Sequence, residues 1–187
     1  MFWQEAKENE NYIVPDDIVD VVFSIQCRTL PVDHSYALSQ AVSEALPWFA
    51  DETHAGLHPI HGAESGNGWM RPDKPNALLH LSRRTKLMLR LPKQRIEDAS
   101  KLTGQTLNID GNTMQVDKAV VKPLSALTTL FSRYIVASEG LDETAFMREA
   151  QALLADIGVH PKKMLCGIER VIAMPDREIH TRSLMLA

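Results

Sequence analysis

The 187-residue sequence has few cysteines and no long apolar run. Its two cysteines, Cys27 and Cys166, lie far apart in apolar stretches of strand-like pattern, where cysteine is usually a small buried hydrophobic residue. No stretch approaches the roughly 18 apolar residues that a membrane span requires, and no apolar run follows a basic flank at the start. We therefore expect reduced thiols, a cytoplasmic location, and neither a membrane span nor a signal peptide.

Acidic residues outnumber basic ones, which alone argues against nucleic acid as a partner. The formal net charge is −4, yet residues 1–82 carry −8, whereas residues 83–101 hold seven basic and two acidic side chains, net +5. This short basic segment is consistent with a solvated strand edge and helix face, or with a contact for a polyanion. With 44% hydrophobic and 24% charged residues, the rest of the composition is that of a globular protein.

The first half of the chain alternates between strand and helix patterns. Residues 19–27 alternate apolar and more polar side chains, which predicts a half-buried strand. Apolar residues at helical spacing between Asp33, a possible N-cap, and Pro47 predict a helix. The Gly-, Pro- and His-rich stretch 54–75 reads as a strand or two interrupted by a long loop, and such loops are often functional.

A second helix and a hairpin complete the first pattern. Residues 86–91 alternate leucine with basic residues or methionine, which predicts a strand with cations on one face. A helix follows between Pro92 and the stop signal Gly104, and a hairpin turns at Asp110-Gly111. The order strand, helix, strand, strand, helix, strand is that of the ferredoxin-like fold.

The pattern begins again after residue 127. We expect a strand over Leu130–Ala137, a helix over Asp142–Ile157, and strands over Lys163–Ala173 and Ile179–Ala187. On one side the helix carries five apolar residues, Phe146, Ala150, Leu153, Leu154 and Ile157. The predicted fold is therefore α+β, with tandem ferredoxin-like (RRM-like) βαββαβ domains over residues 1–127 and 128–187, the second incomplete at its C-terminus.

Several unusual strings occur together in one order, including VDVVFSIQCRTLPVDHSYALSQ, IHGAESGNGW, LSRRTKLMLRLPKQRIEDASKLTGQTL and TRSLMLA. From about residue 18 to Ala187 the chain resembles the CRISPR-associated repeat-RNA endoribonucleases of the Myxococcus subtype, within the repeat-associated RAMP family. The resemblance implies two ferredoxin-like domains, no cofactor, and metal-independent cleavage of pre-crRNA that leaves a cyclic phosphate. It implies CRISPR repeat RNA, crRNA and other complex subunits as partners, with no membrane. Members typically continue past the position of Ala187 into a glycine-rich loop and a final strand.

Cleaving RNA without a metal needs a base for the ribose 2′-hydroxyl, a group that stabilises the phosphate, and an acid for the leaving oxygen. His34 is the candidate base, because the start of a helix favours the neutral imidazole, and its string matches the resembled family. The alternative for His34 is a surface position beside a helix cap. Tyr36 is a candidate hydrogen-bond donor, although a helix-surface or core role is the commoner one, and His61 is the next candidate base.

RNA contacts are expected mainly from cationic side chains, which can form forked hydrogen bonds to phosphates. The expected RNA-binding residues are Arg28, Arg83, Arg84, Lys86, Arg90, Lys93, Arg95 and Trp69. Trp69 could stack on a base or pack in the core. The three histidines His54, His58 and His61 could form a metal site, but Pro59 interrupts them and no metal is expected.

Three functions remain open from the sequence. The first is an endoribonuclease that matures crRNA and stays on it as a subunit of the interference complex. The second is a non-catalytic crRNA-binding subunit of that complex. The third is a ferredoxin-like interaction protein without RNA, which the acidic first 82 residues would suit.

Overall fold

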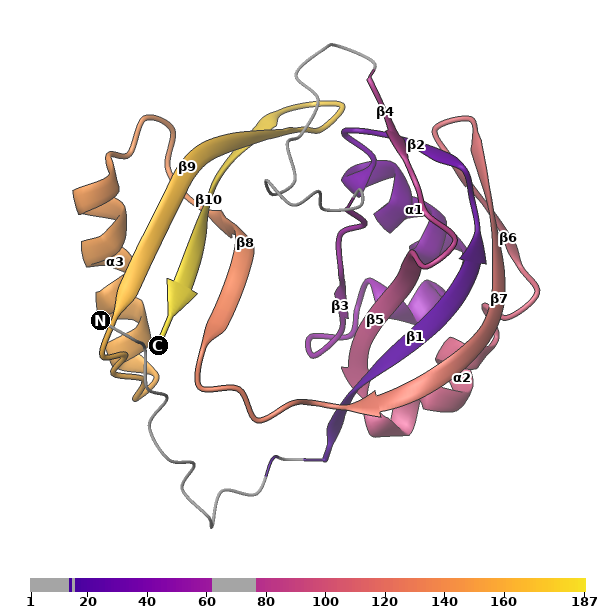
Figure 1. The fold of residues 1–187 in the computed structure, drawn as a ribbon, viewed down its shortest axis with the longest axis horizontal. Helices are drawn as coiled ribbons and strands as arrows, with labels where there is room; N and C mark the ends of the chain where they lie inside the picture. The colour runs from indigo at the N-terminus through magenta and orange to yellow at the C-terminus, as the bar shows by residue number, and fades with distance from the viewer. Residues whose placement is uncertain (1–13, 15, 62–76) are drawn as a thin grey trace. The chain divides into compact units, whose positions relative to one another are not determined.

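The computed structural model describes residues 14, 16–61 and 77–187, which form two compact units (Figure 1). The first unit contains the described residues up to Val32 together with the described residues between 37 and 126. The second unit contains residues 33–36 and 127–187. Each unit has its own antiparallel sheet and its own apolar core.

The first unit is built on a five-stranded antiparallel sheet with the strand order β3-β5-β1-β7-β6. Its strands are β1 (Ile18–Gln26), β3 (Gly56–Leu57), β5 (Lys86–Pro92), β6 (Thr106–Ile109) and β7 (Asn112–Pro123). The central strand β1 lies between β5 and β7, as Figure 1 shows. A separate pair of short strands is formed by β2 (Thr29–Pro31) and β4 (Leu78–His80).

Two α-helices cover one face of this sheet. They are α1 (Ser35–Ala45) and α2 (Ile96–Ser100), accompanied by the short 3-10 helices η1 (Pro47–Phe49) and η2 (Lys93–Arg95). Leu38 and Val42 of α1 join one core with Phe23 of β1 and Leu89 of β5, all with buried side chains. The predicted alternation of β1 and β5 is confirmed, because their odd-numbered residues face the helices.

The second unit has the order strand, helix, strand, strand. Its elements are β8 (Leu130–Val136), α3 (Glu143–Asp156), β9 (Met164–Ala173) and β10 (Glu178–Leu186), with the strand order β8-β10-β9. This is the order of the first three strands of a ferredoxin-like sheet. Asp142 caps α3, since its side chain accepts a hydrogen bond of 2.8 Å from the backbone N–H of Ala145.

The structure departs from the sequence-based expectation at three helices. Helix α1 begins at Ser35, one residue later than an N-cap at Asp33 would place it. Helix α2 is short and follows a 3-10 turn, although Gly104 has the expected positive φ of 84° beyond its end. In α3, Phe146 is buried against the sheet, whereas Leu153 is 69% exposed. The helical periodicity predicted which side of α3 is apolar, but it did not predict that only part of that side is buried.

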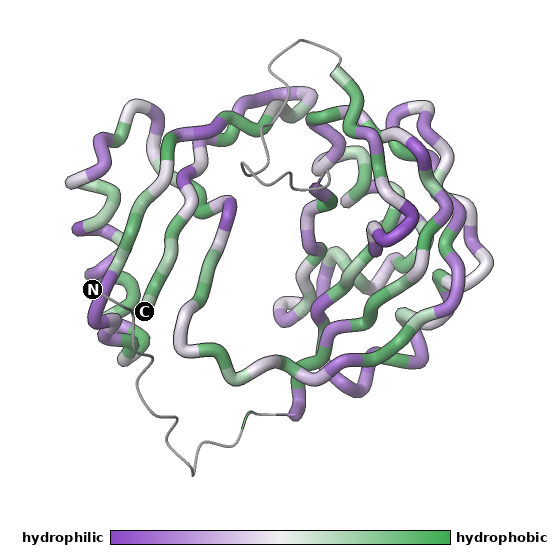
Figure 2. The backbone as a smooth tube through the Cα atoms, viewed as in Figure 1, coloured by the Kyte–Doolittle hydropathy of each residue, from purple (hydrophilic) through white to green (hydrophobic). Residues whose placement is uncertain are grey.

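Figure 2 shows the mixed hydropathy along the strands of both units, which is the pattern of sheets with one apolar and one more polar face. Among the described residues, no helix is both long and apolar enough to cross a membrane.

Candidate nucleic-acid interface

The face of the first sheet opposite α1 and α2 carries four cationic side chains. Lys86 and Arg90 lie on β5, and Lys118 and Lys122 lie on β7, on either side of β1. All four are exposed and alternate along their strands with residues of the other face. We call these four residues the basic face. The two on β5 were predicted from the sequence as RNA contacts, whereas the two on β7 were not, although a spacing of four residues places both lysines on one face of a strand.

Strand register sets the pattern of the basic face. Asp20 in β1 is the cross-strand neighbour of Arg90 on one side and of Lys122 on the other. Two residues further along, Val22 lies between Met88 and Val120. The face therefore has an apolar row in its middle, and it has cations from both neighbouring strands.

The strands β1, β5 and β7 are fully described, and they place no aromatic side chain on this face. Phe23, which is their only aromatic residue, is buried in the core on the other face. RRM-type sheets hold single-stranded RNA by stacking bases on aromatic side chains. The basic face is therefore suited to contacts with the phosphate backbone rather than to base stacking.

Asp20 organises one end of the basic face. The Arg90 guanidinium donates two hydrogen bonds to its carboxylate, Nε to Oδ1 at 2.9 Å and Nη2 to Oδ2 at 3.0 Å. The hydrogen bond to Asp20 raises the pKa of Arg90. His58 lies beside them, with Nε2 at 3.7 Å from the same carboxylate, and burial lowers the pKa of its imidazole. His58 is therefore neutral at pH 7.

The lowered pKa of His58 predicts a pH-dependent stability. An unfolded chain takes up a proton at this histidine below about pH 6.5, whereas the folded protein does so only at lower pH. The stability linked to His58 is thus fully present above that pH and is lost as the pH falls towards the folded pKa. We expect His58→Gln to flatten the loss of stability between pH 7 and 5, as measured by urea denaturation. The exposed His54→Gln is the matched control, and an unchanged pH profile in His58→Gln would contradict the assignment.

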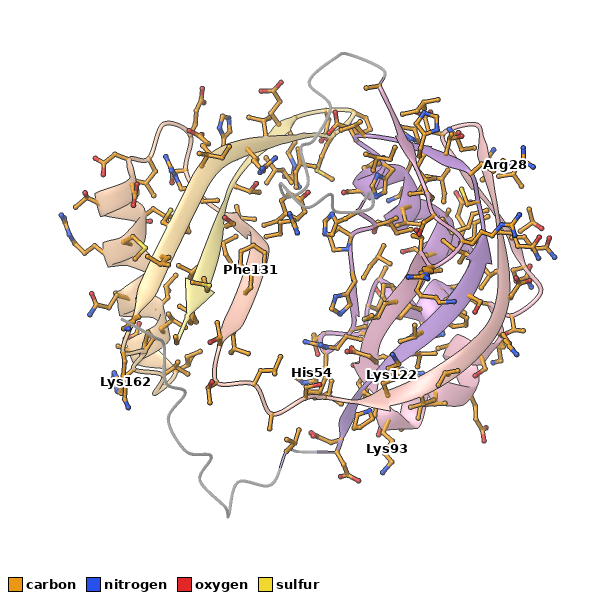
Figure 3. All side chains as sticks on the ribbon, in the orientation of Figure 1. Arg28, His54, Lys93, Lys122, Phe131 and Lys162 are labelled. Carbon is orange, nitrogen blue, oxygen red and sulfur yellow. The ribbon has the colours of Figure 1, made fainter. Side chains whose placement is uncertain are left out.

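A groove of about 910 Å³ lies at the end of β1, where β1, β5 and β7 meet the loop before β5. Three of the predicted RNA-binding residues, Arg28, Arg83 and Lys86, line it. The pairing of β2 with β4 brings them together, because the Leu81 N–H donates to the carbonyl oxygen of Arg28 at 2.9 Å. Figure 3 labels Arg28 and Lys122 towards opposite ends of the β1–β7 pair.

Hydrogen bonds hold the polar side chains that line the groove. Lys86 Nζ donates to Ser24 Oγ at 2.9 Å across the β1–β5 pair. On the β7 side, Gln26 Nε2 donates to both carboxylate oxygens of Asp117, at 3.2 and 3.1 Å. The groove therefore combines three cations with one carboxylate.

The cations of the basic segment 83–101 have different surroundings in the fold. Arg83 and Lys86 line the groove, whereas the cations after β5 form ion pairs. Lys93 Nζ is 2.7 Å from Asp16, and Arg95 forms ion pairs with Glu52 and Asp98 at 3.1 and 3.3 Å. The Arg95 guanidinium also lies 5.0 Å from the centre of the Trp48 ring. The structure gives Arg95 packing and ion-pair contacts, and neither residue lies on the strands of the basic face. Arg84 is exposed in the loop before β5 but does not line the groove.

The three catalytic candidates differ in accessibility. His34 directly precedes α1 and is 3% exposed, so its imidazole is almost entirely enclosed by the protein. Tyr36, in the first turn of α1, and His61 are partly buried. His34 and Tyr36 group with residues 127–187, whereas the groove belongs to the first unit. Trp69 falls outside the described residues.

The described ranges, 14, 16–61 and 77–187, contain no group of three or more His, Cys, Asp or Glu side chains placed to hold a metal ion. Of the three histidines considered as a metal site, His58 instead lies against Asp20. Both cysteines are free thiols and partly buried, and burial raises the pKa of the Cys27 thiol.

The fold is shared with solved structures of one group of proteins. One, described as "CRISPR associated protein Cas6", has a TM-score of 0.56 and 11% sequence identity, covering 91% of this chain and 87% of that chain. A second, described as "Characterization of a Cas6-related gene from Pyrococcus furiosus", has a TM-score of 0.52 and 13% identity, covering 90% and 87%. The class is therefore the α+β fold with tandem ferredoxin-like domains, as predicted.

The sequence defines the family. The model of the Cas6 family, described as Cas6 Crispr, matches residues 19–187, so this chain belongs to the Cas6 family. A curated relative, the CRISPR-associated endonuclease Cas6 of Myxococcus xanthus (strain DK1622), is 26% identical over 161 residues. That match covers 86% of this chain and 65% of the relative, so this chain spans less than two thirds of the relative's length. The resemblance inferred from the sequence strings is confirmed.

Proposed function

We propose that this protein is an endoribonuclease that binds CRISPR repeat RNA and cleaves it, without a metal ion, to mature crRNA. The observation that carries the proposal is the Cas6 family match over residues 19–187, with a relative named as an endonuclease. The groove and the basic face support it, because together they present Arg28, Arg83, Lys86 and two β7 lysines to a polyanion, whereas Arg90 is held by Asp20. This local concentration of cations offsets the net charge of −4.

In the proposed reaction, His34 takes the proton of a ribose 2′-hydroxyl as general base. The resulting oxygen attacks the adjacent phosphorus, the bond to the 5′-oxygen breaks, and that oxygen takes up a proton. The products are a 2′,3′-cyclic phosphate and a 5′-hydroxyl. Tyr36 and His61 are the further candidates for hydrogen bonding and proton transfer. Because His34 is 3% exposed, RNA binding has to open its surroundings before the 2′-hydroxyl can reach the imidazole.

The basic face and groove hold the phosphates of the repeat, while hairpin shape and a few unpaired bases give specificity, since side chains cannot enter the deep groove of A-form RNA. The product stays bound, and the protein joins other CRISPR-associated subunits around the crRNA. A cytoplasmic location follows from this substrate.

We expect the protein to cleave its own repeat RNA in EDTA and to leave a 2′,3′-cyclic phosphate. The reason is that the 2′-hydroxyl supplies the nucleophile, so no metal-bound water is needed. Gel electrophoresis of end-labelled repeat RNA measures the cleavage, and mass spectrometry identifies the 3′ end. A repeat with a single 2′-deoxyribose at the cut site is the control, and it should bind but remain intact.

A strict requirement for added divalent metal would contradict this mechanism. Tight binding without cleavage under any condition would instead identify a non-catalytic crRNA-binding subunit. An absence of binding in a gel-shift assay would instead support the third function, a ferredoxin-like interaction protein that does not bind RNA.

A further inference from the structure

The groove at the end of β1 contains one feature that phosphate binding does not explain. Of the described residues that line it, Asp117 alone is acidic, and it shares the groove with Arg28, Arg83 and Lys86. A carboxylate repels a phosphate, so in a site for phosphate alone it would weaken binding. The carboxylate contributes to ligand binding only where the ligand also presents hydrogen-bond donors.

The geometry of Asp117 shows which donors it accepts. A single group, the Gln26 amide nitrogen, donates to both of its carboxylate oxygens at 3.2 and 3.1 Å. Both oxygens are therefore turned towards the same partner. Gln26 is exposed, so a ligand that offers donors to both oxygens can displace its amide at little cost.

We propose that the groove binds one unpaired nucleotide of the RNA and that Asp117 selects guanine there; this rests on the proposed function. The Watson–Crick edge of guanine presents two adjacent donors, N1–H and the N2 amino group, which match the two acceptor oxygens of a carboxylate. Adenine and cytosine each present one donor beside an acceptor. That acceptor would face the second carboxylate oxygen and could not form a hydrogen bond with it. Uracil presents one donor between two acceptors.

The remaining groups of the groove complete this arrangement. The Gln26 amide, once displaced, can donate to guanine O6, which lies next to N1 on the same edge. Arg28, Arg83 and Lys86 hold the flanking phosphates. The groove volume of about 910 Å³ lies within the range of small-molecule sites, which is ample for one nucleotide.

The test measures the affinity of the intact protein for fluorescein-labelled uridine decamers that carry one central G, A, C or inosine. We expect the G decamer to bind about 10-fold more tightly than the A or C decamer, the scale of one bidentate base contact. Inosine, which lacks the N2 amino group, should fall between them. In Asp117→Asn the side chain presents one donor and one acceptor, so the preference for G should disappear or turn towards A and C.

The matched control is Asp51→Asn, which makes the same change at an exposed residue outside the groove. It removes the same negative charge, so any gain in RNA affinity that comes only from weaker repulsion should appear in both variants. Only Asp117→Asn should alter the base preference. Equal affinities of the wild-type protein for G, A and C, or a G preference retained in Asp117→Asn, would overturn the assignment. If repeat RNA still binds and is cleaved in that case, the proposed function stands. If neither the decamers nor the repeat binds, both fail.

Discussion

Replacing His34 by alanine is expected to lower the single-turnover cleavage rate by about 10²–10⁴-fold, the usual contribution of a positioned general base. RNA affinity should change little, because a neutral imidazole adds little attraction for phosphate. Without it, the 2′-hydroxyl has no nearby acceptor for its proton in the transition state. The loss should therefore appear in the rate of the chemical step, measured with enzyme in excess over labelled repeat RNA, and not in the dissociation constant.

The burial of His34 requires a control for folding, since removing a side chain that is 3% exposed also removes packing contacts. His34→Gln keeps a polar side chain of similar size but cannot act as a base, so it should lose activity while its thermal midpoint stays near that of the wild type. Cleavage near the wild-type rate would exclude His34, and His61→Ala would then be tested in the same assay.

Removing two cations from the groove should produce the largest change in RNA affinity. For Arg83→Ala combined with Lys86→Ala, we expect the dissociation constant at about 0.1 M salt to rise roughly 10- to 100-fold. The physical reason is that each phosphate contact releases condensed counterions, which contributes about 0.7 to 0.9 to the slope of log K against log salt. The slope should therefore become shallower by about 1.4 to 1.8, as measured by fluorescence anisotropy over a salt series.

A second double variant separates a local contact from a change in net charge. Lys101→Ala with Arg148→Ala removes the same charge, but Lys101 follows α2 on the helical side of the first sheet and Arg148 lies on α3. Its affinity and salt slope should stay close to those of the wild type. If both double variants weaken binding equally, the groove has no special role, and the attraction comes from the protein's overall charge.

Lys93 and Arg95 are expected to behave differently from the groove cations. The sequence predicts both as RNA-binding residues, because they belong to the basic segment 83–101. In the structure they are held by Asp16, Glu52 and Asp98. An ion-paired side chain has to give up its partner before it binds phosphate, so its contribution to RNA affinity is smaller.

Local patterns in the sequence were enough to predict most of the secondary structure. The alternation of β1 and β5 identified both strands and the face of each residue, because side chains along a strand point to opposite sides. Helical spacing located α3 to within one residue at each end. The same strings were specific enough to give the family, which the match over residues 19–187 confirmed.

Only the tertiary structure decided which cations share a surface. Arg28 and Arg83 line the same groove because β2 pairs with β4. Lys122 lies across β1 from Arg90 because β5 and β7 both pair with β1, with Asp20 as the cross-strand neighbour of each. Periodicity cannot predict such neighbours, since they depend on hydrogen bonds between strands that are far apart in the sequence. The burial of His34 and the place of Asp117 in the groove likewise became visible only in the tertiary structure. The sequence by itself determined the elements, the faces and the family, and long-range strand pairing determined the site.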